Sequence, residues 1–257
     1  MTEDVPRMPA PSDEHFERAF RKASRPGVFT DVLDLPRLRA ALSTERLRGE
    51  FGAVRVPVAR MRGEDLVVDP EHGIVQESVS FADFLGGAAA GEGGYLMPRE
   101  EELPASLRSV LEAPRYCDGA WWKVTRFWIA ARDTVAVMHR DLADNLHTVL
   151  EGEKTFTLAA PAESARVYPR GLLSGMPNGA RIDPEHLDFE RFPMSRGLRL
   201  EAVRVRAGET LFLPGGWWHH VRTARGTASL NTWWARGWRL PVVAAADAFK
   251  RLRGVSR

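Results

Sequence analysis

The 257-residue chain contains almost no cysteine and no long apolar run. Cys117 is the single cysteine, which excludes an internal disulfide and a cysteine-based zinc site, so any metal must be bound by histidine and carboxylate. No apolar stretch approaches the roughly 20 residues that cross a bilayer, and we expect no membrane span. Residues 1–13 are acidic and contain proline, unlike a secretory signal, which predicts a cytoplasmic location.

The chain also has little excess charge, with a formal net charge of +2 at pH 7. With 44% hydrophobic and 27% charged residues, its composition is that of a globular protein large enough for one β-barrel domain with added elements. The basic residues near the C-terminus leave an RNA partner open as a less favoured alternative. Their other explanation is a helix end, where basic side chains complement the helix dipole. These residues are Lys250, Arg251, Arg253 and Arg257.

The first third of the chain predicts mixed helices and strands after a flexible lead. We expect the lead over 1–12 and a single domain over 13–257. The glycine-rich residues 86–94 are expected to form a mobile loop. Apolar spacing, charge pattern and turn residues favour helices and strands. The helices are expected within 13–23, 35–51 and 81–85, and the strands within 25–29 and 53–58.

From Trp121 onward the composition changes to that of a β-barrel. All eight tryptophans lie between Trp121 and Trp238, among short alternating segments separated by glycine and proline. We expect a barrel core over about 121–238, with an insertion over 172–196 that is rich in Pro, Gly, Asn and Asp. Residues 240–254 predict a C-terminal helix suited to docking or to homodimer formation, because several apolar residues share one face. They are Val243, Ala246, Phe249 and Leu252.

Histidine and aspartate in two separate segments form the strongest chemical pattern. His139 and Asp141 end an apolar run, and residues two apart on a strand share a face, so both side chains can chelate one metal. A second strand offers His219 or His220. Arg222 shares a face with His220 and indicates solvent there, so His219 is the favoured ligand. Two imidazoles and one carboxylate leave three positions open on octahedral iron(II).

Lys154 begins an alternating run that places it on the same face as Phe156 and Leu158. A lysine that points into an apolar interior needs an anion to stay charged. The alternative is a lysine beside a hairpin turn that reaches solvent. Asn145 and Asn231 also lie in strand-like segments, where a buried amide needs a partner, either a bound ligand or the backbone at a bulge.

These segments resemble the JmjC and cupin-like (cupin-8) hydroxylases. The resemblance rests on MHRDLADNLHTVLEGEKTFTLAAP (138–161), AGETLFLPGGWWHHV (207–221) and SLNTWW (229–234). It extends to RPGVF, RLRGEFGAVRVPV and SFADFLGG in the first third, and so covers most of the chain. It implies a mainly β fold, a double-stranded β-helix (jelly roll), with N-terminal α/β elements and a C-terminal helix.

The resemblance also implies an oxygenase that uses Fe(II) and 2-oxoglutarate. The iron ligands that it implies are His139, Asp141 and His219. Lys154 would pair with the distal carboxylate of 2-oxoglutarate, and three further residues match co-substrate positions. These are Asn145, Asn231 and Tyr95. The family often has Thr or Ser three residues before the first metal histidine, where this chain has Ala136, so Thr134 or a neighbouring strand must supply that hydrogen bond.

The favoured reaction is hydroxylation of a C–H bond in a protein, peptide or small-molecule substrate. N-demethylation and tRNA-base hydroxylation are alternatives within the family. A non-catalytic cupin-like binding module would keep the barrel, and a zinc or manganese cupin would have no need for Lys154. His139-Arg140-Asp141-Leu142 also resembles the catalytic loop of protein kinases, but the spacing to Asn145 and the absence of a phosphate loop argue against that class.

Overall fold

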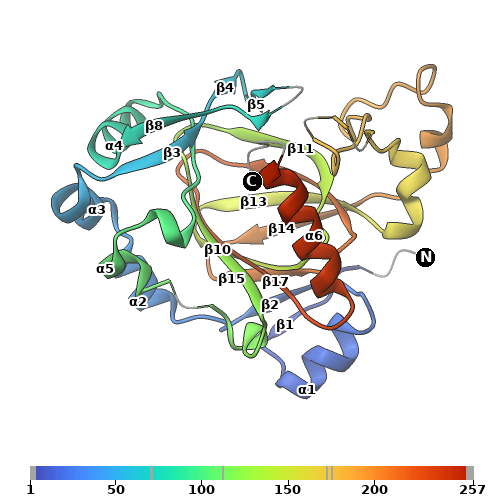
Figure 1. Ribbon diagram of the computed structural model, residues 1–257, viewed down its shortest axis with the longest axis horizontal. Coiled ribbons are helices and arrows are strands. Elements are labelled where there is room, and N and C mark those ends of the chain that lie inside the picture. The colour runs from blue at the N-terminus through green and yellow to red at the C-terminus, as the bar shows by residue number, and fades with distance from the viewer. Residues whose placement is uncertain (1–3, 70–71, 112, 172, 175, 253–257) are drawn as a thin grey trace.

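The computed structural model describes residues 4–69, 72–111, 113–171, 173–174 and 176–252. Two four-stranded antiparallel sheets face each other and enclose a barrel (Figure 1), with strand orders β15-β12-β17-β10 and β14-β13-β16-β11. This is the jelly-roll architecture that the sequence predicts. The eight strands are β10 (Trp122–Ala130), β11 (Thr134–Arg140), β12 (Asp144–Glu151), β13 (Glu153–Ala159), β14 (Glu201–Arg206), β15 (Glu209–Leu213), β16 (Trp218–Thr223) and β17 (Ala228–Ala235).

Short N-terminal strands extend both sheets. The first sheet grows to nine strands, and β4 and β5 extend the second to six. Residues 1–12 were predicted to be a flexible lead, whereas β1 pairs in parallel with β2, because the edge of β2 offers free backbone hydrogen-bonding groups. The added strands are β1 (Arg7–Pro9), β2 (Gly27–Thr30), β3 (Arg55–Ala59), β4 (Met61–Arg62), β5 (Asp65–Leu66), β8 (Gln76–Ser80) and β9 (Tyr95–Leu96). Strands β6 (Val68–Asp69) and β7 (Gly73–Ile74) pair separately.

Helices from the first half of the chain cover the outer face of the nine-stranded sheet (Figure 1). Side chains of Ser12, Asp34, Ser43 and Ser80 cap the N-termini of four of them. Apolar residues of these helices pack on Phe127 and Leu230 of the sheet. The helices are α1 (Asp13–Phe16), a π-helical continuation (Glu17–Arg21), α2 (Leu35–Ala41), α3 (Thr44–Phe51), α4 (Phe81–Ala90) and α5 (Ala105–Arg108). The 3₁₀ segments are Glu100–Glu102, Arg115–Cys117, Pro161–Val167 and Pro193–Gly197.

The prediction of a mobile loop over 86–94 is wrong for its first half, because α4 continues through Ala90. The buried side chains of Phe81, Phe84 and Leu85 anchor the helix, and three consecutive alanines after the two glycines favour its continuation. The helix ends at Gly91, whose φ of 79° is the left-handed conformation that glycine adopts at helix ends.

The predicted insertion covers the outer face of the second sheet. Its backbone pairs with β11, since the amide of Ala180 donates to the carbonyl of Met138 at 2.8 Å. Met138 and Trp218, which point out of the barrel, are buried against Phe192 and other apolar residues of the insertion. In Figure 1 these segments lie on the side of the barrel opposite helices α2 to α5.

The barrel interior has two halves of different chemistry. The apolar half is lined by the inward residues of β13 to β16 and one residue each from β2 and β12. Its members are Val28, Val149, Phe156, Leu158, Val203, Val205, Leu211, Leu213 and Val221. The polar half is lined by β10, β12 and β17, where residues that pair across adjacent strands share a face. Its members are Arg126, Trp128, Asn145, His147, Ser229, Asn231 and Trp233.

The C-terminal helix α6 (Arg239–Leu252) docks on its own barrel through Val243, which packs with Ala143 and Ala235. At its start the Arg239 guanidinium lies 3.2 Å from the carboxylate of Asp144. The side chains of Lys250, Arg251 and Leu252, and residues 253–257, lie outside the described part, so the predicted basic tail and dimer face are not tested. Within the described ranges, no helix is long and apolar enough to cross a membrane.

Candidate functional site

Three residues from two neighbouring strands converge at the barrel interior. His139 of β11 pairs directly with His219 of β16, and their ring centroids are 4.1 Å apart. Asp141 follows β11, and its Oδ2 lies 3.8 Å from Nε2 of His219. One ligand atom from each of the three residues lies within 4.8 Å of the others. The structure thus brings together the histidine-aspartate-histidine set that the sequence predicts.

Hydrogen bonds orient both imidazoles for metal binding. Nδ1 of His139 lies 2.7 Å from the carbonyl of Val137, and Nδ1 of His219 lies 3.2 Å from the carbonyl of Trp217. When each Nδ1–H donates to its carbonyl, the lone pair of Nε2 is free to bind a cation. Burial lowers the pKa of His219, so this imidazole is neutral near pH 7 and can act as a ligand.

Contacts from β17 and the β15–β16 turn hold Asp141 in place. Nε1 of Trp233 donates a hydrogen bond to Oδ2 of Asp141 at 2.8 Å, and the amide of Gly216 donates to the Asp141 carbonyl at 2.7 Å. The alternation of Ser229, Asn231 and Trp233 indicated a shared face. The role of Trp233 was not predicted, because its register against Asp141 depends on the barrel.

His219, the favoured ligand, lies with His139 and Asp141, whereas His220 points to the other face, but the reason given for the choice is only partly right. Arg222 is exposed on the outer face, as predicted. However, Trp218 and His220 on the same face are 0% and 2% exposed, because the insertion covers them. Alternation fixed the two faces of the strand, but it could not show that a distant segment shields one of them.

Lys154 points into the barrel at the start of β13, as the alternation predicts. Gly152, with a φ of 73°, forms the tight turn from β12 that sets this register. Nζ of Lys154 donates a hydrogen bond to the hydroxyl of Tyr95 at 2.7 Å and lies 5.7 Å from the ring centre of Trp128. Among the described residues, no carboxylate lies within ion-pair distance of Lys154. Burial therefore lowers its pKa far below the ordinary value.

Hydroxyl groups surround the lysine and Tyr95. Burial raises the pKa of Tyr95, and hydrogen bonds from the Thr223 and Ser229 hydroxyls oppose that rise. The sequence left open which residue replaces the family's Thr or Ser at Ala136. Thr134 donates to the carbonyl of Arg132 at 3.0 Å, whereas Thr223 pairs with Lys154 across β16. The neighbouring strand thus places a hydroxyl beside Lys154 and Tyr95.

The remaining predicted residues line the space between Lys154 and the histidines. Nδ2 of Asn231 donates to Oδ1 of Asn145 at 3.3 Å, and both side chains are buried. Several buried polar atoms on this face have no hydrogen-bond partner within the described ranges, among them Trp128 Nε1, His147 Nε2 and Asn231 Oδ1. His147 and Trp128 were not singled out in the sequence, although they alternate with buried apolar residues on strands β12 and β10.

A family model matches this geometry across most of the chain. The model described as a cupin-like domain matches residues 13–238. The chain belongs to the JmjC and cupin-like family of 2-oxoglutarate oxygenases. Members of this family use Fe(II) and 2-oxoglutarate, and the family assignment agrees with the resemblance seen in the sequence.

Curated relatives carry JmjC names. Jumonji C domain-containing protein 5 of Drosophila melanogaster is 29% identical over 90% of this chain and 60% of its own length. Lysine-specific demethylase 8 of Xenopus tropicalis is 26% identical over 90% of this chain and 53% of its own length. The human bifunctional peptidase and (3S)-lysyl hydroxylase JMJD7 is 25% identical over 87% of this chain and 81% of its own length. The chain thus spans little more than half of the first two relatives.

The site fits both family cofactors. Two imidazoles and one carboxylate suit Fe(II) and would leave positions for other ligands. Slight inward movement of the three side chains would bring their ligand atoms from within 4.8 Å to the spacing around one ion. The lysine without a carboxylate partner, and the unpartnered polar atoms beside it, fit a small dicarboxylate. His139, Asp141 and His219 would hold the metal, and Lys154 and Tyr95 would bind the far carboxylate.

Proposed function

We propose that this protein is an Fe(II)- and 2-oxoglutarate-dependent dioxygenase that hydroxylates a C–H bond in a protein or peptide side chain. One observation carries the proposal: the His139, Asp141 and His219 cluster faces the same interior as a buried lysine that has no carboxylate partner among the described residues. Burial of an unpaired ammonium group is costly, so the lysine needs an anion, and a carboxylate of 2-oxoglutarate supplies one.

Each part of the site has a distinct task in this reaction. When bound, iron and 2-oxoglutarate supply the oxidising chemistry. Lys154 and Tyr95 bind the distal carboxylate by a charge-assisted hydrogen bond and a hydroxyl, and this fixes the co-substrate in one direction. Trp233 holds the Asp141 carboxylate in one orientation. The outer helices and the insertion pack on the two outer faces of the barrel.

The first test is an anaerobic titration of the apo-protein with Fe(II) and then 2-oxoglutarate. We expect a visible charge-transfer band from the chelated keto acid in the wild type and none in the His139→Ala variant. Lys154→Ala should retain metal binding but require far more 2-oxoglutarate for the same band. If the wild type gives no band while it binds Fe(II), the oxygenase proposal fails, and a binding module or a cupin with another metal becomes the better explanation.

The substrate class is supported by the names of the relatives, which include a lysyl hydroxylase and lysine-specific demethylases. Incubation of the loaded protein with lysine- and arginine-containing peptides, followed by mass spectrometry, separates the two reactions. Hydroxylation adds one oxygen atom, whereas demethylation removes a methylene unit from a methylated peptide. Turnover of 2-oxoglutarate that is stimulated only by tRNA would instead favour the RNA alternative. The cytoplasmic location and the homodimer remain predictions.

A further inference from the structure

A second cluster of metal-ligand residues lies on the outer face of β16, on the opposite side of the strand from His219. His220 points there and is 2% exposed, because the insertion covers it. Its Nδ1 atom is buried and has no hydrogen-bond partner within the described ranges. A buried polar nitrogen without a partner is costly, so this atom needs a ligand that the protein does not itself provide.

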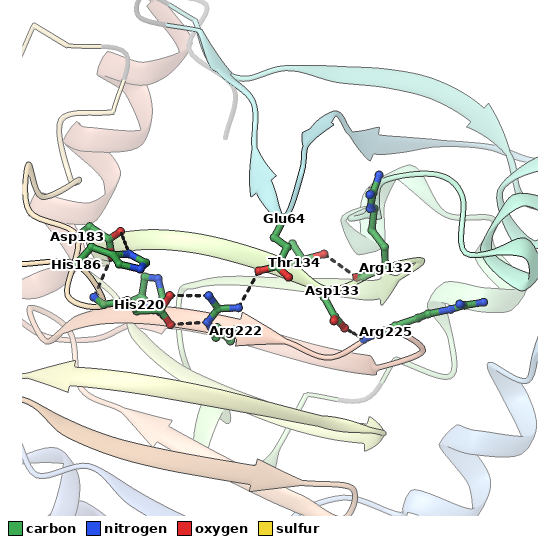
Figure 2. A network of polar contacts seen from close by, with 10 residues as sticks. Glu64, Arg132, Asp133, Thr134, Asp183, His186, His220, Arg222 and Arg225 are labelled. Carbon is green, nitrogen blue, oxygen red and sulfur yellow. Dashed lines mark hydrogen bonds and ion pairs between the residues drawn. The ribbon is translucent and has the colours of Figure 1, made fainter.

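Two carboxylates of the insertion approach this nitrogen. Oε1 of Glu185 lies 4.0 Å from Nδ1 of His220. Asp183 completes the group, since one ligand atom from each of the three residues lies within 4.8 Å of the other two. Figure 2 shows Asp183, His186 and His220 together at one end of a polar network, with Arg222 between this group and Glu64.

The backbone and neighbouring side chains hold the two carboxylates in place. The amide of Glu185 donates to Oδ1 of Asp183 at 2.9 Å, which fixes a tight turn around Pro184. Nη2 of Arg222 donates to Oε2 of Glu185 at 2.6 Å, and Nη1 of Arg222 donates to Glu64 at 2.8 Å. The site is therefore built from both the insertion and β16 before any ligand binds.

The ion-pair network alone does not account for His220. Arg222 forms ion pairs with both Glu185 and Glu64. Its single positive charge therefore offsets only one of these two carboxylates, and Asp183 adds a further negative charge. The side chain of Asp183 pairs with the exposed imidazole of His186, at 3.0 Å, in addition to the Glu185 amide. A cation that binds the imidazole nitrogen and both carboxylates would satisfy the buried atom and offset the remaining negative charge.

We propose that Asp183, Glu185 and His220 bind a divalent transition metal, with zinc as the expected ion, and that this metal fastens the insertion to the outer face of β16. Imidazole nitrogen and carboxylate oxygen are ligands that zinc accepts at about 2.0–2.2 Å, usually with four ligands in total. His186 can supply the fourth ligand by a change of side-chain rotamer. This site is separate from the oxygenase centre, and its occupancy does not depend on the proposed function.

The test adds zinc to the apo form of the whole chain and measures the number of zinc ions bound per chain by mass spectrometry. The catalytic triad also binds zinc, so the His139→Ala variant isolates the second site. We expect two equivalents in the wild type, one in His139→Ala and none in His139→Ala with Asp183→Asn. Asp183 is 52% exposed in its side chain, so this change leaves the fold intact, as circular dichroism would verify.

His72→Ala in the His139→Ala background is the matched control. His72 and Asp69 form an exposed pair at 2.9 Å with the same three-residue spacing as His186 and Asp183, but among the described residues they belong to no group of three possible metal ligands. This control should retain one equivalent. Zinc should also raise the melting temperature of His139→Ala by about 5 °C at saturating concentration, and should not do so once Asp183 is changed.

Two results would overturn the proposal. No zinc in His139→Ala would mean that the outer cluster is an ion-pair network only. Retention of one equivalent after Asp183→Asn and also after His220→Gln would place the bound zinc elsewhere. Neither result bears on the charge-transfer band of the oxygenase centre, so the two proposals can fail independently.

Discussion

The two halves of the barrel interior show how one fold separates stability from chemistry. The apolar half is closed by side chains such as Val205 and Leu211, which are 0% exposed and belong to the same hydrophobic cluster. The polar half contains Lys154 at its edge and several buried polar atoms without partners. Burial stabilises the first half at roughly 1.5–3 kcal/mol for each large apolar side chain. The buried polar groups of the polar half lower the stability of the fold, but they form a binding site before a ligand is present.

The largest expected effect tests the apolar half. Leu211→Ala should lower the free energy of unfolding by about 2–5 kcal/mol, because it removes buried methyl groups and leaves a cavity. Urea denaturation measures this change. The folded fraction should still bind 2-oxoglutarate with near wild-type affinity. A large loss of affinity in folded protein would show that the two halves are not energetically separate.

Lys154→Met should have the opposite effects, with weaker binding of 2-oxoglutarate and no loss of stability. Affinity for 2-oxoglutarate should fall by about 30-fold or more, since loss of one partner of a buried charge pair costs about 2 kcal/mol at least. The apo-protein should be as stable as the wild type or more stable, because methionine removes a buried ammonium group. Calorimetric titration and urea denaturation measure the two quantities. Lys123→Met on the exposed face of β10 is the matched control and should change neither. Unchanged affinity in Lys154→Met would contradict the assignment.

Trp233→Phe sharpens the comparison within the polar half. It removes the hydrogen bond to Asp141 and keeps an aromatic ring, so metal affinity should fall by about 10-fold while the co-substrate pocket is retained. Competition with a fluorescent chelator measures the metal affinity. Trp234→Phe, on the outer face of the same strand, should leave metal affinity unchanged. Equal losses in both variants would indicate a general packing effect.

The smallest effect is a pH dependence of the apo-protein. The folded pKa of Lys154 lies well below its unfolded value near 10.5, so between the two values unfolding takes up a proton. Stability should therefore rise with pH in this window, by at most about 1.4 kcal/mol per pH unit, relative to Lys154→Met. Urea denaturation of both proteins from pH 7.5 to 9.5 measures the difference. Parallel curves would mean that Lys154 stays charged in the apo-protein.

The sequence predicted the site residues because strand alternation places them directly. The pairs His139 with Asp141, and Lys154 with Phe156, each depend only on a two-residue period. The structure confirms that the three metal-binding candidates meet and that Lys154 contacts Tyr95. Tyr95 could be assigned only through the family resemblance, because its position depends on β9 pairing with β10 across the chain.

Features that depend on contacts between distant segments could not be predicted. His220 was expected to face solvent, and its burial arises from an insertion whose Asp183 and Glu185 come about 35 positions earlier in the chain. The role of Trp233 depends on a cross-barrel register with Asp141. Strand β1 forms only because β2 has a free edge, which local composition does not show. The second half of α4 was missed for a different reason. Its two glycines favoured the prediction of a loop, whereas the buried side chains at the start of α4 anchor a helix that continues through Ala90.

The contact between Arg239 and Asp144 has a practical consequence for anyone who shortens this chain. Asp144 is buried, accepts the Gly215 amide at 2.9 Å, and relies on Arg239 and Arg21 for its charge balance. A side chain at position 215 would collide with the carbonyl of Leu142, which follows Asp141 of the candidate metal site. The family match ends at residue 238, one residue before Arg239. An expression boundary drawn at that limit would remove a counter-charge of Asp144, three residues from Asp141, so a boundary after α6 is the safer choice.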